Sequence, residues 1–159
     1  MHLSINLTLA FIILPLTTSL GINCRGSIVC SDTQSRLRPD NNLIASFFAA
    51  ISRGDSYFIR GGPISPKYIY HSGEHIACQL SIFGPGGICV FAQGNIPPEG
   101  VSGELVVTRL RDLLVHECNE CGSVPLSGDN DPDKMGLLTV NYVSKATCSG
   151  VCNYSTSQQ

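Results

Sequence analysis

The chain has 159 residues, a formal net charge of −2 and no tryptophan. This length suits one domain, and the slightly acidic balance argues against a nucleic-acid-binding protein, which normally carries a basic patch or stripe. The balance also gives no support for attachment to anionic lipid through a polybasic segment. Eight cysteines, an even number, indicate an oxidising compartment and about four disulfides.

The N-terminal residues, 1–19, have the pattern of a secretory signal peptide. An apolar stretch over residues 7–16 is too short to span a bilayer, and small residues follow it up to Ser19. We expect cleavage between Ser19 and Leu20. No later stretch is long and apolar enough to cross a membrane. The sequence therefore predicts a secreted, extracellular protein without stable membrane insertion.

Residues 20–152 form the predicted domain. No internal repeat or low-complexity linker divides it. Residues 153–159 are rich in Ser and Gln, and we expect them to form a flexible tail. Asn153 opens an Asn-Tyr-Ser sequence, which is an acceptor pattern for N-glycosylation.

The pattern of apolar residues predicts two amphipathic helices and about five strands. Spacings of three and four predict a helix over residues 41–53, with Gly54 as its stop, and a helix over 102–117, with Ser102 as its cap. Predicted strands cover residues 57–60, 67–70, 75–80, 88–93 and 137–143. Because helices and strands do not alternate regularly, we expect an α+β fold. This fold is a small disulfide-stapled sandwich, in which two helices cover an antiparallel sheet of about five strands.

The segment His71-Ser72-Gly73-Glu74-His75 matches the H-x-x-E-H pattern of one class of zinc metalloproteases. That mechanism needs both histidines on one face of a helix. Here Ser72-Gly73 breaks any helix, and a predicted strand follows directly. We therefore interpret the segment as a turn before a strand.

Two further motifs are better explained without a metal. His116-x-Cys118-x-x-Cys121 looks like part of a zinc or redox site, but in a secreted chain with six other cysteines disulfides are the better interpretation. The acidic loop over residues 129–133 begins like a calcium loop. It has Lys134 and Val140 where such a loop needs Gly and Glu. We expect no metal, no cofactor, no enzymatic chemistry and no nucleic-acid partner.

Residues near both ends of the predicted domain carry a family resemblance. They are LGINCRGS at residues 20–27 followed by Cys30, C-x-x-C-G-S-x-P-L at residues 118–126, and LTVNYV at residues 138–143. Together these segments closely resemble the fungal killer toxins of the KP-four type, a family whose first smut-fungus example is virus-encoded. Over residues 31–73 the resemblance is weak, because this chain is longer there.

The resemblance implies a small secreted α/β sandwich that inhibits the growth of competing or host cells without enzymatic action. The implied partner is a membrane protein of the target cell. The family's founding toxin is regarded as a blocker of calcium uptake through membrane channels, so a calcium channel is the implied target. The resemblance also implies the disulfides Cys24–Cys118 and Cys30–Cys121. We expect the protein to be a monomer.

Two arrangements remain open for the other four cysteines. Cys78 and Cys89 lie in predicted strands joined by the glycine-rich turn at residues 84–87, so a hairpin would place them face to face at the distance that a disulfide requires. Cys148 and Cys152 would then close a small loop. In the rival arrangement, the C-terminal pair is tied back to Cys78 and Cys89.

One stretch departs from the family pattern. The founding toxin carries Lys and Arg just before the cysteine that matches Cys78, and a basic residue there is associated with channel block. This chain has Glu74-His75-Ile76-Ala77 in that stretch. We therefore predict target-binding residues among exposed polar groups on the loops between the disulfides: Arg60, Lys67, His71, His75 and Lys134. A second function class stays open, a secreted fungal effector that acts on a plant host through another protein partner.

Overall fold

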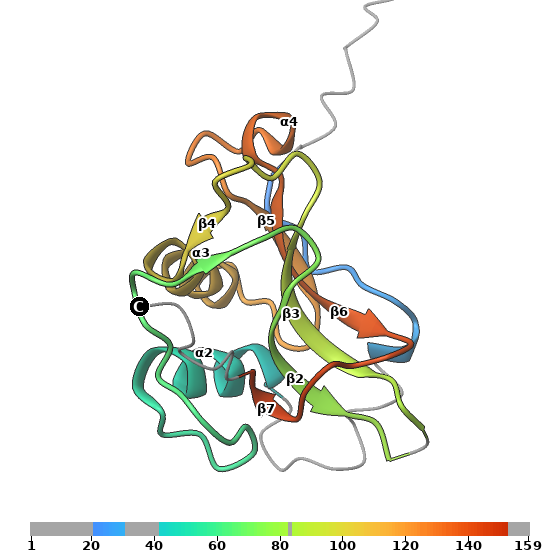
Figure 1. The fold of residues 1–159 in the computed structure, drawn as a ribbon. Coiled ribbons are helices and arrows are strands. Elements are labelled where there is room, and N and C mark those ends of the chain that lie inside the picture. Colours follow the sequence, from blue (N-terminus) through green and yellow to red (C-terminus); the bar gives the residue numbers. More distant parts are fainter. Residues whose placement is uncertain (1–20, 31–41, 83, 153–159) are drawn as a thin grey trace, which may run out of the picture.

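The computed structural model describes residues 21–30, 42–82 and 84–152, and its main element is a five-stranded antiparallel sheet with the order β5-β6-β3-β2-β7 (Figure 1). These strands span Gly122–Pro125 (β5), Leu137–Val143 (β6), Gly87–Gln93 (β3), His75–Leu80 (β2) and Gly150–Val151 (β7). Strands β1 (Ile69–Tyr70) and β4 (Val101–Ser102) form a separate two-stranded sheet. The predicted signal peptide and the tail with Asn153 lie outside the described residues.

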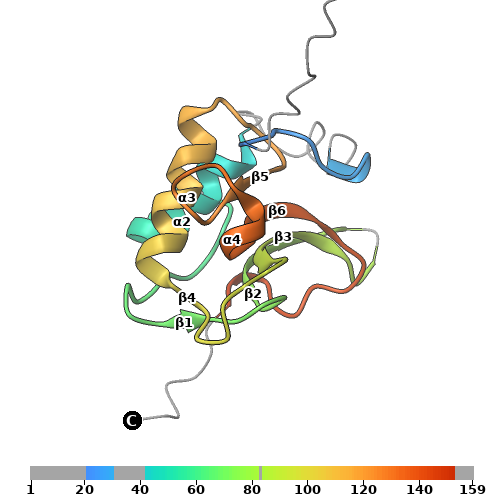
Figure 2. The ribbon, with the colours of Figure 1, turned by 90° about the horizontal axis from the view of Figure 1, so that it is seen from above.

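Two helices, α2 (Leu43–Arg53) and α3 (Gly103–Val115), lie on one side of the sheet, as seen from above in Figure 2. The side chain of Asn42 caps α2 by accepting a hydrogen bond from the Ala45 amide at 2.7 Å. Gly54 ends this helix at φ 75°, a left-handed conformation that glycine adopts without strain. The Ser102 hydroxyl caps α3 through the Leu105 amide at 3.2 Å. These observations confirm the predicted α+β fold.

Both faces of the sheet are buried. Successive side chains of a strand point to opposite faces, and along β3 Ile88 and Val90 enter the core beneath the helices, where Phe47 and Leu110 are fully buried. On the opposite face, Cys89 belongs to a smaller cluster with Cys78, Cys152 and the partly buried Phe91, Val143, Ala146 and Cys148. The helices therefore cover one face, and the chain between β6 and β7 contributes to covering the other.

Some of the predicted elements differ from the structure. The prediction of a strand at residues 57–60 is wrong: this segment is an irregular loop, in which Tyr57 is exposed and Ile59 is buried. The predicted strand at 67–70 is reduced to β1, whereas 75–80 and 137–143 have the predicted bounds. The pattern also missed β4, β5, β7 and the short helix α4 (Pro132–Met135), because elements of two to four residues carry little periodicity.

Candidate target-binding surface

Four disulfides pair all eight cysteines: Cys24–Cys118, Cys30–Cys121, Cys78–Cys89 and Cys148–Cys152. The first two are the pairs that the family resemblance implies. Cys78 and Cys89 are directly opposite each other in the ladder between β2 and β3, with 4.1 Å between their Cα atoms. Of the two arrangements left open by the sequence, the structure therefore has the hairpin pairing. Because the sulfurs of Cys118 and Cys121 are bonded to other cysteines, the His116 motif supplies no thiolate for zinc.

The five predicted target-binding residues are distributed over the molecule and do not form one patch. Arg60 lies beside β7, where its carbonyl accepts a hydrogen bond from the Val151 amide at 2.7 Å. Lys134 lies in α4, at the opposite end of the view in Figure 1. Lys67 is exposed. It lies next to the start of α3, where the carbonyl of its neighbour Pro66 accepts a hydrogen bond from the Glu104 amide at 3.0 Å.

His71 and Glu74 form the turn that the sequence predicts before β2. The carboxylate of Glu74 accepts hydrogen bonds from the His71 amide at 2.8 Å and from the Tyr68 hydroxyl at 3.1 Å. The Glu74 amide donates to the His71 carbonyl at 3.1 Å. Within the described part of the chain, no cluster of candidate metal ligands contains both His71 and His75. The H-x-x-E-H segment is therefore a structural turn.

His75 begins β2 and is half-buried between the turn and the chain that leads to β7. The amide of Thr147 donates to His75 Nδ1 at 3.3 Å, and the Thr147 hydroxyl lies 2.9 Å from the same nitrogen. Its ring also lies near Phe91, with 6.0 Å between the ring centroids. Desolvation by this burial lowers the pKa of His75 below its usual 6.5. His75 therefore favours a neutral imidazole that accepts hydrogen bonds.

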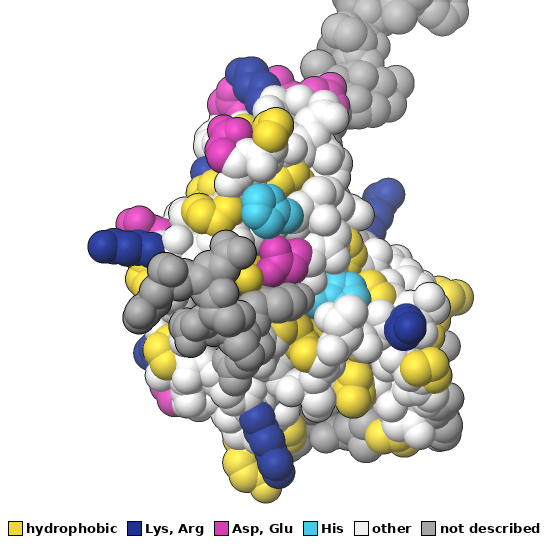
Figure 3. Space-filling model, viewed as in Figure 1, with side chains coloured by type: hydrophobic (Ala, Val, Ile, Leu, Met, Phe, Trp, Pro, Cys, Tyr) yellow, Lys and Arg dark blue, Asp and Glu magenta, His cyan; other side chains and the backbone are white. Residues whose placement is uncertain are grey.

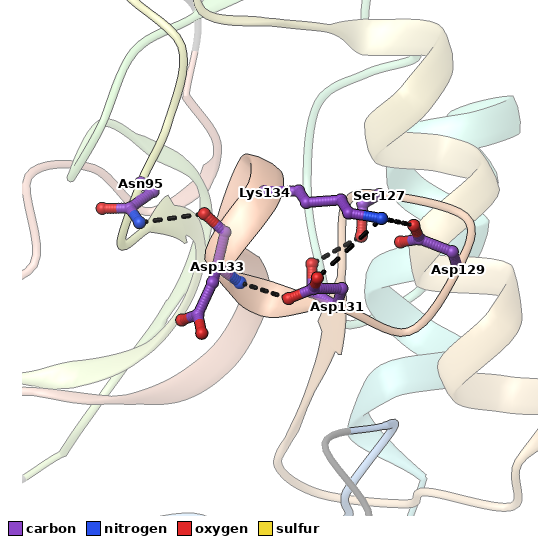
Figure 4. Close-up of polar contacts among 6 residues, drawn as sticks. All are labelled: Asn95, Ser127, Asp129, Asp131, Asp133 and Lys134. Atoms are coloured by element: carbon purple, nitrogen blue, oxygen red, sulfur yellow. Dashed lines mark hydrogen bonds and ion pairs between the residues drawn. The ribbon is translucent and has the colours of Figure 1, made fainter.

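Lys134 is held within the acidic loop (Figure 4). Its ammonium group donates to the carboxylate of Asp129 and lies 3.9 Å from that of Asp131. The hydrogen bond from Lys134 is the main cause that lowers the pKa of Asp129 to about 2, and Asp129 in turn raises the pKa of Lys134. Asp131 also caps α4 through the Asp133 amide at 3.0 Å. Since the carboxylates of Asp129 and Asp131 both lie near the ammonium group, Lys134 offers little net positive charge to a partner.

The sequence reasoning missed a group of exposed apolar side chains at the edge of the sheet formed by β2 and β7. Tyr57 is 91% exposed, Ile82 65% and Leu80 43%. Arg60 and Lys145 are also exposed on the loops that meet this edge. A signal was present in the sequence, because residues 75–98 contain no charged side chain and residues 134–159 contain no carboxylate.

The sequence of this chain is similar to those of known proteins. The family model Kp4 matches residues 7–144 of the chain. The KP4 killer toxin of Ustilago maydis P4 virus is 33% identical over 132 residues, which cover 82% of this chain and 86% of that toxin. The chain belongs to the Kp4 family. The family match includes both long-range disulfides and strand β6, but Lys145 and the Cys148–Cys152 disulfide lie beyond it.

A membrane-spanning helix needs about 20 predominantly apolar residues. In the described ranges, no helix is long and apolar enough to cross a bilayer.

Proposed function

We propose that this Kp4 family member is a secreted, non-enzymatic toxin that inhibits the growth of competing or host cells by binding a membrane protein, with a calcium channel as the leading candidate. The observation that carries this proposal is the similarity to a killer toxin over most of both chains. The family model also covers most of the chain, residues 7–144. Lack of enzymatic action is part of the proposal and follows from what the family resemblance implies.

The disulfide framework supports an extracellular site of action. All eight cysteines are paired, and two of the pairs join residues more than 90 positions apart. Such bonds persist in oxidising compartments. We expect secreted protein to begin at Leu20 or within about two residues of it. N-terminal sequencing of secreted protein tests this expectation, and finding Met1 would contradict secretion through a cleaved signal peptide.

The charge pattern decides which cations to test first. In the stretch before Cys78, Ile76 and Ala77 are fully buried, so only the side chains of Glu74 and His75 can reach a partner. A cationic contact would therefore need residues outside this stretch. Lys67 and Arg60 are exposed and are the nearest predicted cations. We rank Lys67 first, because Arg60 also lies beside the exposed apolar side chains at the β2–β7 edge, where a change could have a second effect.

A growth assay with purified protein tests the proposal. We expect inhibition of fungal cells in pure culture, and relief when calcium is added. Lys67→Glu should weaken inhibition and leave the thermal midpoint nearly unchanged, since exposed substitutions usually change stability by less than about 0.5 kcal/mol. Arg111→Glu, at an exposed position on α3, is the matched control and should retain inhibition.

The outcomes of this assay separate the function classes. No inhibition of any fungal culture, together with an effect on plant tissue, would favour the host effector over the toxin. Inhibition that calcium does not relieve would retain the toxin and remove the calcium channel. Equal inhibition by Lys67→Glu and the original protein would remove Lys67 from the contact surface.

A further inference from the structure

Carboxylates are distributed unevenly over this molecule. The chain has 12 Asp and Glu residues, yet none lies in residues 75–98 or 134–159. These two segments supply β2, β3, β6 and β7, which are four of the five strands in the main sheet. The net charge of −2 is therefore unevenly distributed, because these four strands carry no acidic side chain.

At the β2–β7 edge of the sheet, this region carries exposed apolar and cationic side chains together. Tyr57 is the most exposed large apolar residue in the described part of the chain, at 91%. Large apolar side chains that gather on a surface often mark an interaction site. We name the group the β7-edge patch, and it consists of Tyr57, Phe58, Arg60, Leu80, Ile82 and Lys145.

Contacts between three segments bring the patch together. Phe58, Arg60 and Leu80 line one hollow of about 210 Å³, and the ring of Tyr57 packs edge-on against Phe58, with 5.1 Å between centroids. The Ala146 amide donates to the Pro85 carbonyl at 2.9 Å, which holds the loop with Lys145 against the turn that follows Ile82. Backbone hydrogen bonds therefore hold the loop with Lys145 and the loop with Arg60 in place at the two ends of the patch.

Gly150 is needed for the position of Arg60. It has φ 86°, and a Cβ atom at this residue would lie 2.3 Å from the Arg60 carbonyl oxygen. Only glycine allows this close approach of the two backbones. The hydrogen bond from Val151 to Arg60 then fixes the loop beside β7. The sequence thus holds a cation next to the exposed apolar side chains.

The described residues next to Tyr57 add no net negative charge to the patch. The nearest carboxylate along the chain from Tyr57 is Asp55, which forms a salt bridge with Arg53 at 2.9 Å and so adds no net charge. Arg60 and Lys145 remain as the charges of the patch. In Figure 3 the lower right part of the face shows yellow and dark blue side chains and no magenta ones.

We propose that the β7-edge patch binds the surface of an anionic phospholipid bilayer. Tyrosine at the level of the headgroups, aliphatic side chains just beneath them and cations facing phosphate are the groups that membrane interfaces favour. Tyr57, Leu80 and Ile82 are each exposed, which suits shallow entry into a bilayer. The hollow of about 210 Å³ is small for a bound peptide. The inference extends the proposed function, since lipid contact would concentrate the toxin where its membrane target lies.

Vesicle co-sedimentation of the purified full chain tests this inference. We expect binding to phosphatidylcholine vesicles that contain phosphatidylserine, weak binding to phosphatidylcholine alone, and loss of binding as salt increases. Lys145→Glu should lower the partition coefficient about fivefold or more, and Ile82→Asp about tenfold. The matched controls, Arg111→Glu and Val115→Asp, change an exposed cation and a 77% exposed apolar residue on α3 and should bind normally.

Three results would overturn the inference. The first is no binding to either type of vesicle by protein that inhibits growth, which would leave the proposed function intact. The second is equal loss of binding in the patch and control variants. The third is loss of growth inhibition in the patch variants without loss of vesicle binding, which would assign the patch to a protein partner. Unchanged circular dichroism in each variant shows that folding is retained.

Discussion

The two edges of the five-stranded sheet are held in different ways. At the β5 edge, Asn23 and Ser123 exchange backbone hydrogen bonds of 2.9 and 2.8 Å. Two disulfides with sequence separations of 94 and 91 fasten the same N-terminal segment. At the β7 edge, the disulfides have separations of only 11 and 4. The two disulfides at the β5 edge join distant parts of the chain, whereas the two at the β7 edge join residues that are close in sequence.

The edges also differ in charge. Residues 116–136, around β5 and α4, carry five carboxylates: Glu117, Glu120, Asp129, Asp131 and Asp133. The β7 edge has exposed apolar and cationic side chains instead. The part of the fold with the long-range disulfides is thus acidic, and the part that we propose to contact a membrane has the local disulfides. The comparison indicates that stability and cell contact can be changed separately.

The largest effect is expected when both long-range disulfides are removed. In the chain-entropy model, closing the loop between Cys24 and Cys118 contributes about 5 kcal/mol to the free energy of unfolding. The Cys30–Cys121 bond then closes a further small ring, which contributes about 3 kcal/mol. Replacing Cys24, Cys30, Cys118 and Cys121 by Ala should therefore leave the protein largely unfolded, because whole domains have only about 5–15 kcal/mol of stability. Circular dichroism measures this directly. A cooperative melt close to that of the original protein would show that the β5 edge does not need these bonds.

Removal of one disulfide at a time should lower the free energy of unfolding by smaller and more similar amounts. The Cys24→Ala/Cys118→Ala variant keeps Cys30–Cys121, so only the small ring is opened, at about 3 kcal/mol. The Cys148→Ala/Cys152→Ala variant should lose about 2 kcal/mol. Denaturant unfolding compares the two free energies. A larger loss for the C-terminal pair would reverse the proposed difference between the edges.

A smaller, pH-dependent effect is expected at the β7 edge from His75. Burial lowers the pKa of His75, so below about pH 6.5 the folded protein binds fewer protons at this residue than the unfolded chain does. The contribution of neutral His75 to stability is therefore fully present above pH 6.5 and is lost as the pH falls through the pKa of the folded state. His75→Asn should narrow the difference in thermal midpoint between about pH 7.5 and about pH 5.5. His71→Asn, at an exposed position, is the control. Equal pH dependence in His75→Asn and the original protein would contradict this account.

The smallest effect is expected in the acidic loop. Lys134 lowers the pKa of Asp129 to about 2. The contribution of the ionised Asp129 to stability is therefore present above the ordinary carboxyl pKa and is lost as the pH falls through about 2. The carboxylate is exposed, and solvent screens such pairs strongly. Asp129→Asn should therefore leave the thermal midpoint at neutral pH unchanged. A decrease as large as that of the Cys148→Ala/Cys152→Ala variant would show a structural role that the contacts do not explain.

Much of the fold could be predicted from the sequence because its long elements are strongly patterned. The stripe of Leu43, Phe47 and Ile51 predicts α2, and runs of strand-forming residues predict β2 and β6 with their observed bounds. The loop at 57–60 has strand-forming residues, but only tertiary contacts fix Ile59 in the core. Strands β5 and β7 are too short to predict. The low carboxylate content of the β7 edge can be counted in the sequence, whereas the position of Arg60 depends on Gly150 and β7.

We propose that the secreted protein inhibits other cells by acting on their membrane from outside. The most direct test measures growth and calcium uptake in the same fungal cultures over a series of protein concentrations. We expect calcium uptake to fall over the concentration range that stops growth, and reduced and alkylated protein to have neither effect. Growth arrest with unchanged calcium uptake would contradict a channel target. Absence of both effects with folded, disulfide-bonded protein would contradict the toxin function itself.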